Sequence, residues 1–177
     1  FPEPKRERHF SDDELARIGA ALAAMEREGV ILPGAARLIR ILALTGMRLG
    51  EALGLRWAWI DAQAACIRLP DAKAGARAVP LGIPALAYLV SLERIGPFVC
   101  HGIEADKPIG SKTFRRAWSE LVKRTGIVGA RPHDFRHTTG TFAAATGANA
   151  FIIRDLMGHK TLAMTGKYVG RTIDPLR

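Results

Sequence analysis

The residues in this sequence that are best suited to chemistry are cations, hydrogen-bond donors and one tyrosine. They are Arg48, Lys73, His133, Arg136, His137, His159 and Tyr168. The set is poor in carboxylates, the oxygen ligands that Mg²⁺ prefers. It suits direct binding of a phosphodiester, because an arginine fork matches two phosphate oxygens and two arginines can neutralise a transition state. Histidines add donors or a base, and a tyrosine oxygen can form a covalent intermediate.

The elements that must position these residues are mostly helical. A capping box of Ser11 and Glu14 begins a first helix, which ends at Gly29. A second helix from Pro33 is apolar on nearly all sides, which indicates a buried, central position. Gly46 ends that helix, and a short helix with Arg48, Glu51 and Leu53 follows. Helical spacing predicts further helices at residues 84–94, 111–124, 132–146 and 149–157.

Between these helices lies a region with short segments separated by turn residues. Three antiparallel strands are expected at residues 57–61, 65–69 and 77–81, with Lys73 in the turn before the third. The predicted fold class is therefore α+β: mainly α, with one small three-stranded antiparallel β-sheet. Residues 1–10 contain two prolines and are expected to form a basic linker, and residues 11–177 are expected to form one domain.

Size, cysteine usage and charge limit the classes of function. The longest apolar stretches fall well short of the ~20 residues that span a bilayer, and no signal-like core begins the chain. Cys66 and Cys100 show no repeated spacing and are expected to be buried thiols in a reducing compartment, so the expected location is the cytoplasm. Twenty-six Lys and Arg against 17 Asp and Glu give a net charge of +9. This excess favours a polyanionic partner, with nucleic acid ahead of an anionic membrane.

Two basic segments are candidate DNA-contacting surfaces. In the helix expected at residues 111–124, Phe114, Trp118, Leu121 and Val122 form an apolar face that basic residues surround. Contacts from such residues to phosphates would supply the salt-dependent part of DNA affinity, and a solvated basic face is the alternative. The candidate DNA-binding residues are Lys5, Arg6, Arg8, Lys112, Arg115 and Arg116.

From Ser11 onward the sequence resembles the tyrosine recombinases, also called phage-type integrases, in their C-terminal catalytic domain. The resemblance rests on five motifs in the family's order. They are an arginine in Thr-Gly-x-Arg-x-x-Glu, a lysine in a β-hairpin, a His-x-x-Arg-His box, a Gly-His pair, and a tyrosine nine residues after that histidine. Each motif alone is a weak signal, but all five occur here in register.

The resemblance implies that Tyr168 is the nucleophile, which attacks the scissile phosphate and forms a 3′-phosphotyrosine. Arg48 and Arg136 match the pair that binds the non-bridging oxygens. Lys73 matches the general acid that protonates the leaving 5′-oxygen.

The resemblance also assigns roles around these groups. His133 matches a donor or base, and His159 matches a donor to the phosphate. Glu51 matches an acidic residue that supports the active site, and His137 is expected to support it as a buried structural residue.

For the whole protein, the resemblance implies a fold related to type IB topoisomerases and a double-stranded DNA partner. It implies a homo-tetramer on DNA for the full-length protein, whereas a monomer of this chain in solution remains open. The N-terminal core-binding domain of the family is expected to be absent from these residues. No cofactor is expected, since the phosphotyrosine stores the energy for rejoining without metal or ATP. The implied role is integration or excision of a mobile element.

Other interpretations stay open. A non-cleaving DNA-binding fragment or homologue is one, and a type IB topoisomerase, which relaxes supercoils by the same chemistry, is another. His133, His137 and His159 could form a three-histidine zinc site. The cation of Arg136 and the lack of a His-Glu-x-x-His motif argue against that site.

Overall fold

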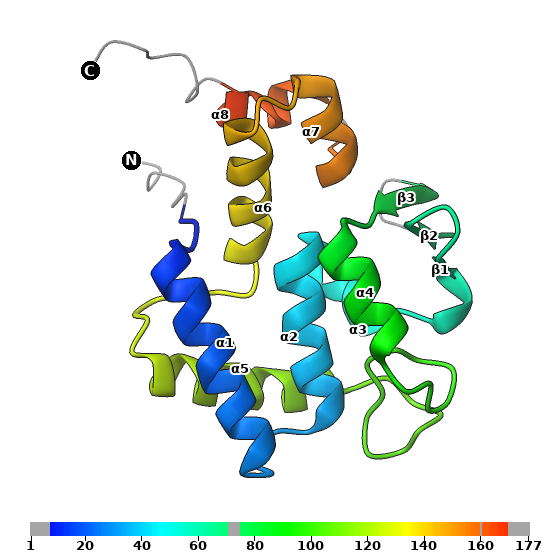
Figure 1. Cartoon of the computed structure of the whole chain (residues 1–177), viewed down its shortest axis with the longest axis vertical. Helices are drawn as coiled ribbons and strands as arrows, with labels where there is room; N and C mark the ends of the chain where they lie inside the picture. The colour runs from blue at the N-terminus through cyan, green and yellow to red at the C-terminus, as the bar shows by residue number, and fades with distance from the viewer. Residues whose placement is uncertain (1–7, 71–74, 160, 170–177) are drawn as a thin grey trace.

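The computed structural model of the chain describes residues 8–70, 75–159 and 161–169, apart from the side chains of residues 167 and 169. Its helices are α1 (Asp12–Arg27), α2 (Pro33–Thr45), α3 (Leu49–Leu53), α4 (Ile83–Ser91), α5 (Ser111–Thr125), α6 (Asp134–Ala145), α7 (Ala150–Met157) and α8 (Gly166–Val169). The strands β1 (Ile60–Asp61), β2 (Cys66–Leu69) and β3 (Arg77–Pro80) form one antiparallel sheet in the order β1-β2-β3 (Figure 1). Two 3₁₀ turns are η1 (Trp57–Trp59) and η2 (Leu162–Met164). The predicted α+β class is confirmed.

Helix α2 is the centre of the core. Its residues Leu38, Ile39, Ile41 and Leu42 are each at most 1% exposed. Helices α1, α3, α4, α5 and α6 all pack against it (Figure 1). This confirms the buried, central position that its apolar sequence predicts. Packing is closest at Gly34, where a Cβ atom would lie 1.9 Å from the backbone oxygen of His101.

The segment expected as the first strand differs from its prediction. Residues Trp57–Trp59 form a 3₁₀ turn, and only Ile60–Asp61 pair with β2. The backbone N–H of Trp57 donates to the carbonyl of Pro97 at 3.1 Å, and Trp59 N–H donates to Arg56 at 3.1 Å. These bonds occupy the groups that a longer ladder would need, so the strand shortens to two residues.

The residues before α1 also depart from prediction. Phe10 was expected in a linker outside the core, but it is 0% exposed, with its ring 4.7 Å from the ring of Phe135. Its backbone N–H donates to Thr138 Oγ1 at 2.8 Å. The linker prediction is therefore wrong at Phe10, because burial of an aromatic side chain outweighs the extended, basic character of the preceding residues. The chain is attached here to α6, and residues 1–7 lie outside the described residues.

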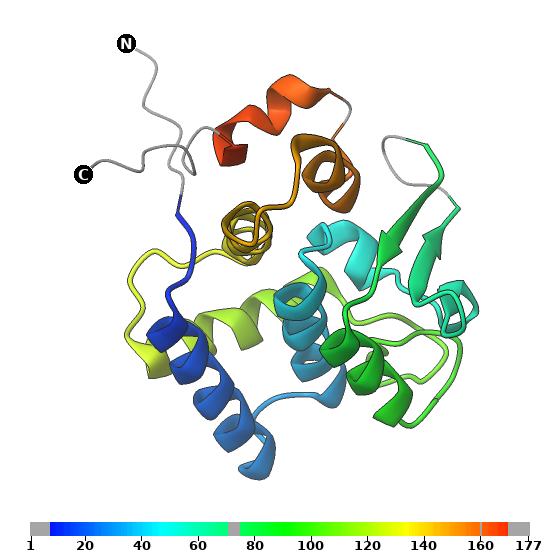
Figure 2. The ribbon, with the colours of Figure 1, turned by 45° about the horizontal axis from the view of Figure 1, so that its top comes forward.

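The last helices form a separate layer. Helix α6 lies between α5 and the α7–α8 segment (Figure 2), and a second cluster of buried side chains joins Ala144, Ile153, Met157 and Tyr168. The end of α7 at Gly158 comes next to Arg77 of β3. Among the described residues, no helix is long and apolar enough to cross a membrane.

Candidate active site

Glu51 is the anionic centre of the site. Its Oε1 accepts a hydrogen bond from Arg48 Nη1 at 2.9 Å, and its Oε2 accepts from Arg77 Nη2 at 2.7 Å and from the backbone N–H of Arg48 at 3.1 Å. Burial acts to raise the pKa of Glu51, but the hydrogen bonds and charges of Arg77 and then Arg48 outweigh it, and the pKa lies below its usual range. The ionised carboxylate therefore fixes two guanidinium groups at once.

Arg136 reaches the same place from α6. Its Nη1 donates to the carbonyl of Gly46 at 2.9 Å, two residues before Arg48, and its side chain is almost fully buried. Gly46 ends α2 in a left-handed conformation (φ 61°), which starts the tight turn into α3. The structure thus brings together Arg48 and Arg136, which lie 88 positions apart in the sequence.

The electrostatics of Arg136 are unusual for an arginine. Burial first, and then the charges of Arg48 and Arg77, lower the pKa of Arg136 to about 10. The guanidinium stays protonated at neutral pH, but its surroundings make the charged form less stable than it is in water. Its Nη2 is buried without a hydrogen-bond partner among the described residues. An anion bound beside these arginines would offset that penalty, which is the electrostatic requirement for holding a phosphate.

Tyr168 is buried on the face of α6. Its side-chain oxygen lies 3.0 Å from His137 Nδ1, and its ring stacks on that of His159 with a centroid separation of 6.2 Å. A Cβ atom on Gly140 would lie 2.6 Å from the Tyr168 ring, so a glycine in α6 lets the tyrosine lie against the helix. His159 is oriented in turn by Thr165, whose Oγ1 lies 3.0 Å from its Nδ1.

The histidines of the His-x-x-Arg-His box occupy one end of α6. His133 is exposed and precedes the first residue of the helix, with its ring 4.9 Å from that of His137 and nearly perpendicular to it. The expectation that His137 is buried is wrong, and its supporting role in the site stays a prediction. His137 is half-buried and contacts the Tyr168 oxygen, because its position in the first turn of α6 faces α8.

Two basic residues from the hairpin region are candidates for the site: Lys73, which was predicted, and Arg77, which was not. Lys73 lies outside the described residues, so its predicted role stays a prediction. Arg77 was not predicted as a site residue, because an arginine in a hairpin resembles a surface charge when only the sequence is considered. The available signal was strand alternation, because Arg77 shares one face of β3 with the fully buried Val79.

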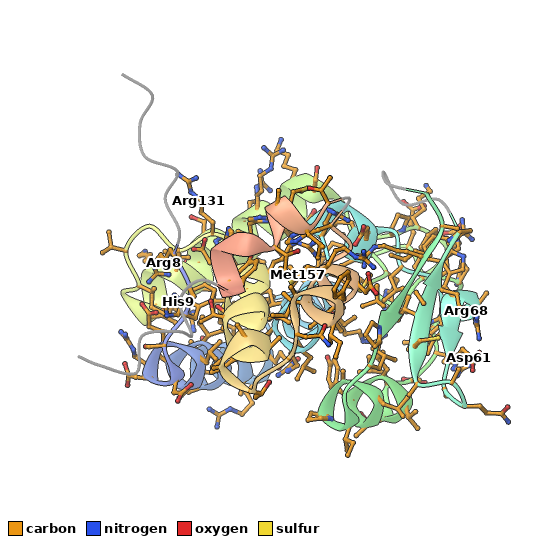
Figure 3. The ribbon with its side chains drawn as sticks, turned by 90° about the horizontal axis from the view of Figure 1, so that it is seen from above. Arg8, His9, Asp61, Arg68, Arg131 and Met157 are labelled. Carbon is orange, nitrogen blue, oxygen red and sulfur yellow. The ribbon has the colours of Figure 1, made fainter. Side chains whose placement is uncertain are left out.

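The predicted DNA-contacting residues have different surroundings. The apolar face of α5 is buried as predicted, and Lys112, Arg115 and Arg116 are exposed on the same helix. Arg8 forms ion pairs with Glu14 and, at 3.7 Å, with Asp134 at the start of α6, and Figure 3 shows it near Arg131. Lys5 and Arg6 lie outside the described residues.

Alternative chemistries find less support in the geometry. Among the described side chains, which include all three histidines of the hypothetical zinc site, no group of three His, Cys, Asp or Glu residues is arranged to hold a metal ion. Cys66 and Cys100 are buried free thiols, as predicted. Burial raises the pKa of Cys100 to about 12, so this thiol is not an activated nucleophile.

Comparison with known proteins places this geometry in context. Residues 11–173 match the sequence profile of the phage integrase family. The tyrosine recombinase XerD of Mycobacterium leprae is 31% identical over 180 residues, which are 94% of this chain and 57% of that protein. The chain therefore spans little more than half the length of this relative.

Solved structures share the fold at lower identity. The catalytic domain of bacteriophage HP1 integrase aligns with a TM-score of 0.68 and 19% identity, covering 92% of this chain and 87% of that domain. The Tn1549 transposon integrase, solved in complex with circular intermediate DNA, aligns with a TM-score of 0.69 and 20% identity. The alignment covers 94% of this chain and 63% of that one.

Proposed function

The chain belongs to the phage integrase family, and we propose that it is the catalytic domain of a site-specific tyrosine recombinase. The observation that carries the proposal is the convergence of two arginines, one directly before α3 and one in α6, beside a buried tyrosine whose oxygen contacts a histidine. A phosphodiester satisfies the excess positive charge of this site, and the tyrosine oxygen supplies the nucleophile.

In the proposed reaction, the Tyr168 oxygen attacks the scissile phosphorus and the bond from phosphorus to the 5′-oxygen breaks. The products are a 3′-phosphotyrosine and a free 5′-hydroxyl, which rejoins by the reverse step. A free tyrosine titrates near pH 10, so its proton must leave during attack. His137 Nδ1, at 3.0 Å, orients the hydroxyl and is placed to accept that proton.

The remaining roles follow the family's pattern. Arg48 and Arg136 bind the non-bridging oxygens, and His159 and His133 add a donor and a donor or base. Lys73 protonates the leaving 5′-oxygen. Because the phosphotyrosine conserves the energy of the phosphodiester, the proposed reaction needs neither ATP nor a metal ion.

The proposed partner is double-stranded DNA, and the structure of the Tn1549 integrase in complex with circular intermediate DNA supports a DNA partner. Contacts from the exposed α5 cations to phosphates would contribute to binding. For the full-length protein we propose a homo-tetramer on DNA that integrates or excises a mobile element in the cytoplasm.

A suicide substrate tests the proposal. Nicked duplexes are made from the DNA that flanks the gene, so that the released fragment diffuses away and rejoining fails. A denaturing gel, run after incubation in EDTA, then compares wild type, Tyr168→Phe and the control Tyr88→Phe, which changes the chain's other tyrosine.

We expect a covalent adduct with wild type and Tyr88→Phe and none with Tyr168→Phe. DNA binding without any adduct would instead support the non-cleaving homologue. An adduct that Tyr168→Phe still forms would disprove the assignment of the nucleophile.

A further inference from the structure

Strand β3 directs one charged side chain into the protein. The Arg77 side chain retains 11% exposure, although an arginine is rarely buried to this degree unless it is paired. Its partner is Glu51, whose Oε2 accepts from Arg77 Nη2 at 2.7 Å. Since Glu51 also binds Arg48, a single carboxylate links the sheet to the first residue before α3.

The guanidinium of Arg77 is also enclosed by the end of α7. A Cβ atom on Gly158 would lie 2.8 Å from Arg77 Cζ and from Nη1, so the guanidinium occupies the space that a side chain would need. The carbonyl of the same glycine accepts a hydrogen bond from Arg48 Nη2 at 2.9 Å. Gly158 therefore contacts both arginines, and it directly precedes His159.

We propose that Arg77 is a positioning residue of the active site, which holds Glu51 and the Gly158 backbone so that Arg48 points at the phosphate. The inference rests on the function proposed above and adds a residue to its machinery. Arg77 acts through its neighbours: its Nη2 binds Glu51, its guanidinium lies against Gly158, and its Nε and Nη1 are buried. Arg48, in contrast, keeps 30% of its side chain exposed and can contact substrate.

Removal of Arg77 should therefore affect the rate of cleavage more than the binding of DNA. In Arg77→Met, Glu51 keeps only Arg48 as a partner, and the surface against Gly158 is lost. A misplaced catalytic group costs up to about 100-fold in rate, so we expect adduct formation to slow by roughly 10- to 100-fold. Affinity for the same duplex should change far less, because the proposed role of Arg77 is to place Arg48 rather than to bind the duplex.

Two further variants make the comparison specific. Arg77→Lys retains the charge without the planar fork, and should recover part of the lost rate. Arg68→Met removes an exposed arginine of the neighbouring strand, which pairs with Asp61 at the outer edge of the sheet (Figure 3). This control should cleave at the wild-type rate.

The experiment combines two measurements. NMR relaxation of the Arg48 Nε–H group in the protein without DNA reports whether Arg48 is held, and backbone amide spectra confirm that each variant folds. Rates of adduct formation on the nicked duplex are measured in parallel. We expect Arg48 Nε–H to be rigid in wild type and Arg68→Met, mobile in Arg77→Met and intermediate in Arg77→Lys. If Arg77→Met does not fold, Arg77→Lys carries the test.

The outcomes separate this inference from the proposed function. Failure of wild type to form an adduct, with Arg48 still mobilised by Arg77→Met, would refute the function and leave the positioning role standing. The inference is overturned if the folded Arg77 variants leave Arg48 Nε–H as rigid as in wild type. It is also overturned if Arg48 becomes mobile while the cleavage rate of an active wild type is unchanged.

Discussion

Replacement of Glu51 by glutamine is the most informative perturbation of stability. The carboxylate accepts three hydrogen bonds, two from Arg48 and one from Arg77. Glutamine keeps the shape but has one acceptor oxygen, and its amide group would face a guanidinium. Arg48, Arg77 and Arg136 would then lie together without an anionic side chain from the described residues among them.

The expected loss follows from burial. Breaking a buried ion pair by removing one partner costs about 3–5 kcal/mol of unfolding free energy. Because Arg48 is partly exposed, we expect a loss at the lower end of this range, about 3 kcal/mol. For a domain of this length, such a loss lowers the melting temperature by roughly 6–12 °C. Glu120→Gln is the control, because Glu120 pairs with Arg124 on the exposed surface of α5 and should matter much less.

The loss should depend on pH in a definite direction. The pKa of Glu51 in the folded protein lies below its ordinary value of 4.5. Its contribution to stability is therefore complete above about pH 4.5, the ordinary carboxyl value, and disappears as pH falls through the folded pKa. Glutamine does not titrate, so the difference between wild type and Glu51→Gln should be largest at neutral pH and shrink in acid.

Urea denaturation followed by tryptophan fluorescence, over a pH series from neutral to acid, measures this difference. A Glu51→Gln variant as stable as wild type at neutral pH would refute the bridging role of the carboxylate. A deficit that stayed constant into acid would show that its origin is packing rather than charge.

Other predictions concern the arginine cluster and the core. Burial and neighbouring cations lower the pKa of Arg136 to about 10, so its charge destabilises the free fold below that pH. Pyrophosphate should therefore raise the melting temperature of wild type in a thermal scan, and not that of Arg136→Met. Phe10→Ala removes a fully buried ring and should cost about 3–5 kcal/mol in urea denaturation, whereas an extended linker residue would cost nothing. Gly34→Ala should destabilise by about 1–3 kcal/mol or more in the same assay, since its Cβ meets the backbone of His101. Gly19→Ala, with open space around it, should be neutral or stabilising.

Local signals in the sequence predicted much of the fold. The capping box of Ser11 and Glu14 forms as expected at the start of α1, with both hydrogen bonds present. The left-handed glycines Gly46 and Gly126 end α2 and α5 where the periodicity stops. These features depend on neighbours within a few residues, so periodicity and capping rules detect them.

Other features depend on distant partners and could not be predicted in this way. Phe10 is buried because it meets Phe135, and His137 contacts the Tyr168 oxygen because the chain returns to α6 at α8. Strand alternation could have indicated that Arg77 points inward with Val79, but its contacts with Glu51 and Gly158 depend on tertiary packing. Residue types and spacing predicted a phosphate-binding set with a tyrosine, but tertiary packing decides which side chains lie around it.

The proposed reaction requires that Tyr168 becomes covalently attached to DNA. The most direct test digests the adduct with nuclease and then with trypsin, which cuts after Lys167 and Arg171, and locates the nucleotide by tandem mass spectrometry. We expect a nucleotide joined through its 3′-phosphate to the tyrosine of the peptide spanning residues 168–171. A nucleotide on any other residue, or one joined through its 5′-phosphate, would contradict it.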